Sequence, residues 1–565
     1  MCIRDRTAVG SVDFLNQNEK NELLQVFNQS NVVESRSETV IDLFEKQVEQ
    51  TPEAVALNFD GSELTYQELH NASNKLADYL SKEKGLQQGE VVGIYLERSE
   101  WMIVAILAIA KSGGAYVPLD PSYPQDRTNY MVDDSACRFV IDETIIEEFK
   151  GNQEVYNEHF NSQSSIDQLA YIMYTSGTTG IPKGVEILQR SVSQLINWSV
   201  REFEHSNVKT VFAATSICFD LSIFEIFYSL CSGKKLRLLP NALSIPEALT
   251  NEEAVLLNTV PGVVAELLRS ETNMDTVNVL NMAGEPIPQS VINALDPEKI
   301  EIRNLYGPSE DTTYSTVYRI GNERKILVGK PISNTKIFIL DQNGQVCPIG
   351  VEGEICIGGE GLARGYRNKH ELTARSFVSN PHDDGNIMYR TGDLGMWHAD
   401  GNIEIFGRID EQVKVRGFRI EAGEVEAAIN KIKGIETSVV VAREVDASGK
   451  RLIAYIESAN KIVPQELKDE LKAVLPAYMI PEYFVQLDTI PRTQNGKVDK
   501  KSLPLPEGKG TESVDYAAPE TALEEQLCAV WEEILEIEKV GALDDFFERG
   551  GHSLKAIRLI GEYHR

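Results

Sequence analysis

Leu169 to Val185 reads Leu-Ala-Tyr-Ile-Met-Tyr-Thr-Ser-Gly-Thr-Thr-Gly-Ile-Pro-Lys-Gly-Val, and this stretch decides how the rest of the chain is interpreted. Its apolar and aromatic beginning predicts a buried strand. The strand leads into small hydroxyl residues and glycines, which let backbone N–H groups fold around an anion, while a lysine adds charge. We therefore expect a phosphate-binding loop made by Thr175, Ser176, Gly177, Thr178, Thr179, Gly180 and Lys183.

This loop differs from the common nucleotide-binding loop, in which Gly-x4-Gly-Lys-Ser/Thr runs into a helix. Pro182 precedes the lysine here, and Val185-Glu186-Ile187 follows it, which favours a second strand. The alternative interpretation is a hairpin turn rich in glycine and threonine that binds nothing. The lysine and the paired threonines argue against that alternative.

Composition limits the possible classes of protein. At 565 residues the chain is too long for one core and predicts three or four folding units. The net charge of −31 argues against non-specific binding to nucleic acid or anionic membranes. The seven cysteines have no Cys-x-x-Cys spacing, which indicates reduced thiols. The longest apolar run, Trp101 to Ala110, is too short to cross a bilayer, and no signal peptide is evident. We expect a soluble, cytoplasmic protein.

Helix and strand patterns alternate from Val40 to about Gly407, which is typical of an α/β fold with helices on both faces of its sheets. Strand patterns at 336–340 and 353–357 predict a smaller β-rich part that closes this region. A new charged α+β unit begins near Asp410.

The end of the chain has a different composition. Pro504 to Pro519 is rich in proline, glycine and acidic residues, which is typical of an interdomain linker. From Leu523 onward, apolar residues recur at helical spacing, so a further helical unit begins there.

Several motifs follow the phosphate loop in a fixed order. They are Asn304-Leu305-Tyr306-Gly307-Pro308-Ser309-Glu310, Tyr389-Arg390-Thr391-Gly392-Asp393-Leu394, Gly407 to Gly417, Asn495-Gly496-Lys497-Val498-Asp499-Lys500, and Asp545 to Leu554. With the phosphate loop, they resemble the adenylate-forming enzymes, which join ATP to a carboxylic acid. More narrowly, they resemble the adenylation domains of nonribosomal peptide synthetases. The resemblance covers nearly all of Val40 to Leu505, and Met1 to Arg6 match no part of it.

The resemblance implies a domain order. We expect a linker after an upstream condensation domain at 1–39, a large N-terminal subdomain at 40–409, a small mobile C-terminal subdomain at 410–505, a second linker at 506–518, and a truncated helical carrier domain at 519–565.

By the same resemblance, ATP and Mg²⁺ have candidate ligands. Asn304 and Tyr306 would hold adenine. The Asn304 amide suits the amino edge of the base, and the Tyr306 ring suits stacking on its face. Glu310 would meet Mg²⁺, since a hard carboxylate suits that ion. Asp393 would accept bonds from the two ribose hydroxyls, and Arg408 would also reach the ribose.

The resemblance also assigns two catalytic lysines, a hinge and an attachment site. Lys497 would bridge the substrate carboxylate and the α-phosphate, and Lys414 would act on the substrate side. Asp410 would be the hinge between two orientations of the small subdomain. Ser553 would carry 4′-phosphopantetheine, so carrier and condensation domains are the expected partners.

The amino-acid pocket implied by the resemblance is formed by Asp220, Leu221, Phe224, Asn258, Asn281, Ala283, Leu305, Thr313, Tyr314 and Lys497. Asp220 and Lys497 would hold the α-ammonium and α-carboxylate. The other eight side chains carry no charge, which disfavours charged substrates. Phe224, Leu305 and Tyr314 would fill much of the space. Such a pocket resembles those associated with alanine, so we expect alanine first and glycine second.

Two other functions stay open. A coenzyme A ligase of the same family would act on an acyl or aryl acid, but Asp220 and the carrier motif argue against it. A non-catalytic docking remnant would not need an intact set of Lys497, Asp393 and Glu310.

Overall fold

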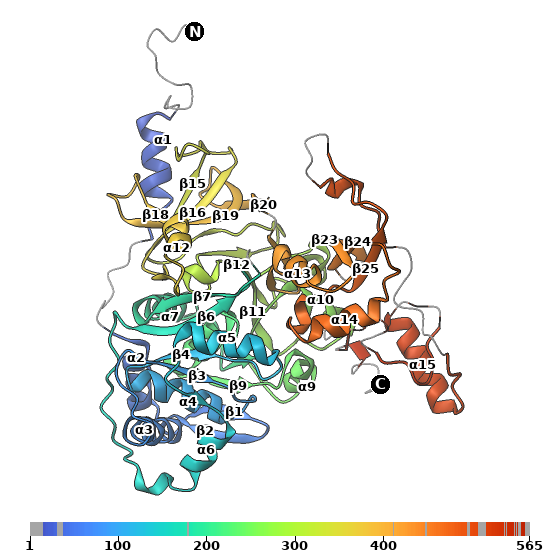
Figure 1. Ribbon diagram of the computed structural model, residues 1–565. Helices are drawn as coiled ribbons and strands as arrows, with labels where there is room; N and C mark the ends of the chain where they lie inside the picture. Colours follow the sequence, from blue (N-terminus) through green and yellow to red (C-terminus); the bar gives the residue numbers. More distant parts are fainter. Residues whose placement is uncertain are drawn as a thin grey trace.

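The computed structural model describes residues 15–30, 38–177, 180–410, 412–446, 449–493, 498–506, 516–535, 537, 539–546, 549, 551, 555–556 and 558–559 (Figure 1). Thr178, Thr179, Lys497 and Ser553, which have predicted roles, lie outside these residues.

The largest sheet of the described chain has nine strands and carries the predicted amino-acid pocket. Its order is β14 (Lys330–Pro331), β13 (Thr316–Ile320), β12 (Glu301–Tyr306), β11 (Val277–Met282), β10 (Val255–Thr259), β8 (Thr210–Ala213), β9 (Lys235–Leu238), β1 (Val55–Phe59) and β2 (Ser62–Thr65). Strands β12, β11, β10 and β8 run parallel, so their carboxyl ends meet at one edge. Ligands of α/β proteins bind at such an edge.

A second sheet of six strands carries the phosphate loop. Its order is β17 (Gly365–Tyr366), β7 (Lys183–Leu188), β6 (Leu169–Thr175), β4 (Ala115–Pro118), β3 (Val91–Ile94) and β5 (Val140–Ile141). Strands β6 and β7 are antiparallel, so the predicted second strand after the loop is confirmed.

Helices fill the space between these two sheets and cover their outer faces (Figure 1). One core joins both sheets through α2 (Val40–Gln50), α3 (Tyr66–Lys82), α4 (Glu100–Lys111), α7 (Gln189–Glu202) and α8 (Leu221–Cys231), with α6 (Glu143–Lys150) packed on it. Helix α4 is apolar on nearly all sides because both sheets enclose it. The outer helices are α9 (Ile245–Leu249), α10 (Pro261–Arg269) and α11 (Gln289–Ala294) on the large sheet and α5 (Gln125–Ser135) on the six-stranded sheet.

A third sheet closes the large part. It contains β15 (Thr335–Leu340), β16 (Gly353–Gly359), β19 (Ile387–Trp397), β18 (Phe377–Ser379) and β20 (Ile403–Arg408), with α12 (His370–Ser376) beside it. The N-terminal α1 (Gln17–Asn21) and the turn that follows it pack here, where Leu23 is buried and the Asn28 side chain pairs with both backbone groups of Ile337.

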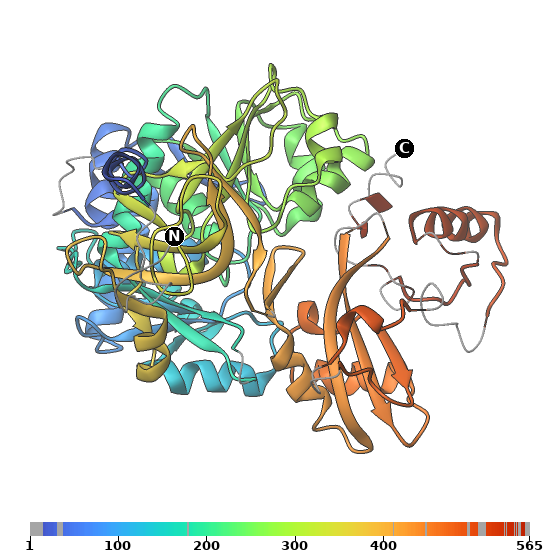
Figure 2. The same ribbon diagram turned by 90° about the horizontal axis from the view of Figure 1, so that it is seen from above.

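The C-terminal part is smaller and lies to one side (Figure 2). It begins with a hairpin of β21 (Gln412–Val415) and β22 (Phe418–Glu421), followed by α13 (Ala422–Ile429), β23 (Ile435–Asp446), β24 (Gly449–Ser458), α14 (Pro464–Lys472) and β25 (Tyr483–Leu487). Helix α15 (Ala522–Leu535) lies beyond it. The predicted α/β class, with a large multi-sheet part and a small C-terminal part, is confirmed; the truncated carrier domain stays a prediction.

Two further features concern the helices and the cysteines of the described residues. Among their helices, none has both the length and the apolar character that crossing a bilayer requires. The six cysteines within this portion of the chain are free thiols.

The small part is docked on the large part by aromatic packing and one buried ion pair. The Phe418 ring stacks on Tyr478 at 4.2 Å, and Phe219 of the large part meets Phe418 edge-on at 4.8 Å. Arg127 of α5 donates to Glu424 of α13 at 2.8 Å, with both side chains almost inaccessible. A buried charge that loses its partner is costly, so this pair favours the observed orientation.

We predict that Arg127→Leu loosens this docking. Glu424 would lose its cationic partner, which costs about 3–5 kcal/mol for a buried pair. Hydrogen–deuterium exchange of peptides from α13 should become faster. Arg190→Leu is the matched control, since Arg190 pairs with Asp167 at an exposed site and should leave α13 unchanged. Equal exchange in the two variants would contradict the assignment.

Candidate active site

A cavity of about 80 Å³ lies where the two large sheets meet the C-terminal hairpin. It is lined by Met173, Tyr174, Thr175, Ser176, Cys218, Phe219, Asp220, Gly284, Gly307, Pro308, Ser309, Thr391, Asp393, Arg408, Gln412, Lys414, Gly417, Arg419 and Tyr478. Six predicted site residues therefore converge on one space: Thr175, Ser176, Asp220, Asp393, Arg408 and Lys414.

The phosphate loop begins and ends on the paired strands β6 and β7, where Thr175 faces Lys183 in register. Gly177 is required by space, because a Cβ there would lie 2.1 Å from the carbonyl oxygen of Ile181. Gly180 has a φ of +79°, which favours glycine. The Thr175 hydroxyl is buried and has no hydrogen-bond partner among the described residues. A buried polar atom without a partner is costly, so this hydroxyl fits a bound oxygen-rich ligand.

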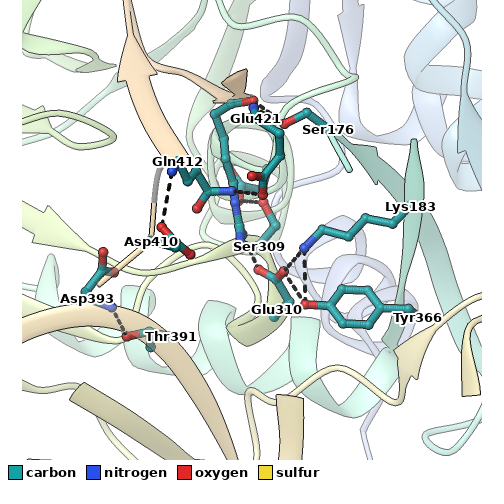
Figure 3. Close-up of polar contacts among 12 residues, drawn as sticks. Ser176, Lys183, Ser309, Glu310, Tyr366, Thr391, Asp393, Asp410, Gln412 and Glu421 are labelled. Atoms are coloured by element: carbon teal, nitrogen blue, oxygen red, sulfur yellow. Dashed lines mark hydrogen bonds and ion pairs between the residues drawn. The ribbon is translucent and has the colours of Figure 1, made fainter. Parts of the chain in front are cut away.

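Glu310 is the centre of a buried charge cluster (Figure 3). Its Oε1 accepts from the Tyr366 hydroxyl at 2.7 Å and from Lys183 Nζ at 3.3 Å. Its Oε2 accepts from Arg419 at 2.6 Å. Burial alone would raise the pKa of Glu310, but Arg419 and Lys183 hold that pKa well below its usual range. The carboxylate therefore stays ionised inside the protein.

The C-terminal hairpin contacts the phosphate loop directly. The Ser176 hydroxyl donates to the carbonyl of Arg419 at 2.8 Å and accepts from the N–H of Glu421 at 3.2 Å (Figure 3). The Gly177 N–H donates to Glu424 at 3.1 Å. In this orientation the hairpin thus occupies donors and acceptors that the sequence assigns to phosphate.

Asp393 lies at the other end of the cavity and has two firm partners. Its Oδ2 accepts from the Tyr306 hydroxyl at 2.6 Å, and its Oδ1 accepts from Arg408 at 2.7 Å. Arg408 also donates to both carboxylate oxygens of Asp410, at 2.6 and 2.7 Å. Burial acts to raise the pKa of Asp410, but this bidentate pair lowers it. The predicted ribose residues and the predicted hinge are thus one connected unit.

The two predicted adenine residues do not line the cavity. Asn304 is buried, and its amide donates to the carbonyl of Leu327 at 2.7 Å. Tyr306 is also buried, with the Lys414 ammonium 5.9 Å from its ring centroid. Their roles toward adenine stay predictions.

Asp220 begins helix α8 and faces the cavity. The Ser309 hydroxyl donates to its Oδ2 at 2.5 Å, and the Thr313 hydroxyl donates to its backbone carbonyl at 2.9 Å. Burial raises the pKa of Asp220, while Ser309 and Lys414 lower it. Burial also lowers the pKa of Lys414, partly offset by Asp393. A cationic group of a ligand would compensate the buried Asp220 charge.

The predicted side-chain pocket is a tightly packed cluster at the ends of the strands. The Phe224 and Tyr314 rings meet edge-on at 5.5 Å, and the Tyr314 hydroxyl donates to Asn258 at 2.6 Å. Ala283 and Leu305 are buried as well, and Leu221 packs against the same core.

Asn281 is the unsatisfied member of that cluster. It pairs in register with Asn258 of the neighbouring strand and is fully buried. Neither its amide nitrogen nor its amide oxygen has a partner within the described residues. A buried amide without partners is destabilising, so Asn281 fits a position where a bound molecule or water supplies a polar atom.

The charge cluster can be tested for a fit to Mg²⁺. Glu310 supplies the hard carboxylate oxygens that Mg²⁺ prefers. No group of three or more His, Cys, Asp or Glu side chains in the described chain could hold a metal alone. The residues would therefore fit Mg²⁺ that takes most of its ligands from phosphates and water and replaces Arg419 at Glu310.

Described residues on both sides of Lys497 lie on the small part. Arg492 and Val498 form an antiparallel bridge. Val498 packs on the sheet face that carries Val439 and Ile453, whereas α13 and α14 cover the opposite face. Because α13 contacts α5 and the phosphate loop, Val498 lies on the face turned away from the large part.

Sequence reasoning missed three residues of this site: Tyr366, Arg419 and Glu225. Tyr366 reaches Glu310 because β17 pairs with β7, and Arg419 does so because the hairpin is docked. Neither contact has a local sequence signal. Glu225 accepts from Asn258 at 3.2 Å and lies one residue after Phe224, so an acid inside an apolar helix was its available signal.

Comparisons with known proteins agree with this arrangement. Residues 44–367 match the AMP-binding enzyme family, and residues 424–497 match the AMP-binding enzyme C-terminal domain. Gramicidin S synthase 2 of Brevibacillus brevis is 40% identical over 98% of this chain, which spans 13% of that protein. Tyrocidine synthase 2 of Brevibacillus parabrevis is 40% identical over 99% of this chain, which spans 16% of it.

Solved structures give the same result. The four-domain nonribosomal peptide synthetase AB3403, in a structure bound to AMP and glycine, is 31% identical with a TM-score of 0.63, covering 96% of this chain and 42% of that one. PA1221, a synthetase protein with adenylation and carrier (PCP) domains, is 25% identical with a TM-score of 0.79, covering 96% of this chain and 93% of that one. The chain belongs to the AMP-binding enzyme family, within the adenylation domains of nonribosomal peptide synthetases.

Proposed function

We propose that this chain activates a small neutral amino acid with ATP and transfers it to a phosphopantetheine thiol of a carrier domain. The observation that carries the proposal is the meeting of the phosphate loop, Asp220, Asp393 and Lys414 around one cavity. An oxygen of the amino-acid carboxylate would attack the α-phosphorus, and the bond to pyrophosphate would break. The thiol sulfur would then attack the acyl carbon of the aminoacyl-AMP, and AMP would leave.

Each group of residues has a part in the first step. The backbone of Ser176 and Gly177, the free Thr175 hydroxyl and Lys183 would hold the phosphates. Asp393 has acceptor sites beyond those used by Tyr306 and Arg408, which suits a ribose diol. When bound at Glu310, Mg²⁺ would neutralise phosphate charge.

The small part must move for this chemistry. A cavity of about 80 Å³ is far below the ~300–1,000 Å³ of pockets for drug-sized ligands. Arg419 also blocks Glu310. We propose that the part after residue 409 rotates about Asp410, which withdraws the hairpin and turns the sheet face with Val498 toward the cavity. Lys497 would act in that orientation.

For the substrate we propose alanine first and glycine second. The packed rings of Phe224 and Tyr314 leave little space, and Asp220 suits the α-ammonium. The bound glycine in the related AB3403 structure supports a small substrate. Asn281 favours serine as the competitor to test, since a hydroxyl could pair with its unsatisfied amide.

Carrier and condensation domains are the proposed partners, because relatives with this architecture are multidomain synthetases. A coenzyme A ligase is the rival function. It would be favoured if acyl or aryl acids, and no amino acid, supported the exchange of pyrophosphate into ATP.

The first prediction concerns the substrate profile. Amino-acid-dependent pyrophosphate exchange should be fastest with alanine, and glycine should follow closely because one methyl group is worth only about 1–3 kcal/mol. Charged amino acids should fail, since their burial without a partner costs several kcal/mol. Tyr314→Ala or Phe224→Ala should admit valine or leucine. Fastest exchange with an aromatic or charged amino acid would refute the pocket assignment. Faster exchange with serine than with alanine would indicate that Asn281 contacts the side chain of the substrate.

The second prediction concerns Lys497. Lys497→Ala should reduce pyrophosphate exchange about 10²–10³-fold, because a cation that stabilises transition-state charge would be lost. Transfer from supplied aminoacyl-AMP to a carrier thiol should continue. Lys501→Ala, an exposed neighbour, serves as the control. Normal exchange in the Lys497 variant would end this assignment.

The third prediction concerns competition at Glu310. Arg419→Gln should lower the Mg²⁺ concentration for half-maximal exchange several-fold, because the guanidinium no longer competes for Glu310. Arg416→Gln is the control, since Arg416 belongs to the same hairpin but pairs with Glu482. A higher Mg²⁺ requirement in the Arg419 variant would mean that Arg419 assists, and does not oppose, metal binding.

A further inference from the structure

Glu225 is a fully buried acid that the proposed reaction does not use. It lies on α8, on the helix that begins at Asp220, among the apolar residues of the central core. Its Oε1 accepts from the Thr215 hydroxyl at 2.5 Å and from Asn258 at 3.2 Å, and its Oε2 accepts from the Thr215 N–H at 3.3 Å. The carboxyl group is therefore held by Thr215 on one side and by Asn258 on the other.

These bonds continue into the amino-acid pocket. Because the Asn258 nitrogen donates to Glu225, its amide oxygen is turned the other way, where it accepts from the Tyr314 hydroxyl at 2.6 Å. In its ionised form the carboxylate can only accept, so it sets the orientation of the amide. The Tyr314 ring in turn packs edge-on against Phe224. Two hydrogen bonds, through Asn258, thus link Glu225 to Tyr314 of the pocket wall and fix the orientation of the Asn258 amide there.

We infer that Glu225 is a positioning residue for side-chain selection, which acts through Asn258 to hold Tyr314 and keep the amino-acid pocket small. The inference rests on the proposed function, since it needs an amino-acid pocket at this place. The residues that limit the size of the substrate side chain would then include one that does not touch the substrate.

The surroundings of Glu225 favour this role. Arg98 donates to the carbonyls of Ala213, Ala214 and Thr215, and so fixes the segment that presents Thr215 to Glu225. Burial raises the pKa of Glu225 to about 7, while Thr215 and Arg98 lower it. One of its bonds leads through Asn258 to the pocket and the others anchor it to Thr215, so this buried acid specifies one arrangement of polar groups.

The test compares the size selectivity of four variants. Tyr314→Phe removes only the tethered hydroxyl. Glu225→Leu removes the hydrogen-bond acceptor with little change in side-chain volume. Glu225→Gln keeps an acceptor oxygen at this position. Glu266→Gln is the control, because Glu266 is buried on α10 and pairs with Arg269. The measurement is the ratio of kcat/KM for 2-aminobutyrate to that for alanine in pyrophosphate exchange, with the KM for ATP recorded alongside.

We expect Tyr314→Phe and Glu225→Leu each to raise this ratio about tenfold, as expected for one lost buried hydrogen bond. A double variant, Glu225→Leu/Tyr314→Phe, should not exceed the larger single effect, because both substitutions break the same chain of bonds. Glu225→Gln should return the ratio to within about twofold of wild type. The KM for ATP should not change in any of them, and Glu266→Gln should match wild type.

An unchanged ratio in Tyr314→Phe, or fully additive effects in the double variant, would overturn the inference. So would a proportional loss of activity toward both amino acids, which indicates a structural role alone. If Glu225→Leu does not fold, Glu225→Met, which also removes the acceptor, takes its place in the single and double variants. If the wild-type protein activates no amino acid, the proposed function fails, which is a different outcome from wild-type activity with unchanged selectivity.

Discussion

The ionised carboxylate of Glu310 is the constraint on which the site depends. It is fully buried, and three groups from three distant segments stabilise it: Lys183 from the phosphate loop, Tyr366 from β17 and Arg419 from the hairpin. A buried charge must have partners, so these segments cannot separate freely. In the proposed function, an incoming cation at Glu310 would replace the one contact that belongs to the small part. The same carboxylate would then couple ligand binding to the orientation of that part.

The sequence predicted the parts of this site that local chemistry determines. The strand from Leu169, the loop after it and the second strand follow from apolar runs, glycines and a proline. Asp220, Asp393 and Lys414 were assigned by motif, and they do line one cavity. The sheets and helices of the large part were likewise predictable from alternating patterns.

Other features depend on distances along the chain that no local pattern encodes. The contact of Arg419 with Glu310 joins residues 109 positions apart and requires the small part to be docked. Tyr306 carries a binding motif, but it is buried with its hydroxyl on Asp393, because the tertiary packing of β12 and the third sheet decides where its ring lies. Glu225 belongs to no motif, because its helix neighbours are apolar and its partners Thr215 and Asn258 lie after β8 and on β10.

The walls of the proposed amino-acid pocket come from helix α8 and from the ends of adjacent strands, with Asn258 and Asn281 side by side near the ends of β10 and β11. The phosphate loop and the ribose unit stand on other sheets. Under the proposed function, replacing Asn258 or Asn281 would thus change one wall and leave the phosphate loop and the ribose unit in place. A fold divided in this way would let the amino-acid preference change through single substitutions in the proposed pocket, while the phosphate loop and the ribose unit are kept.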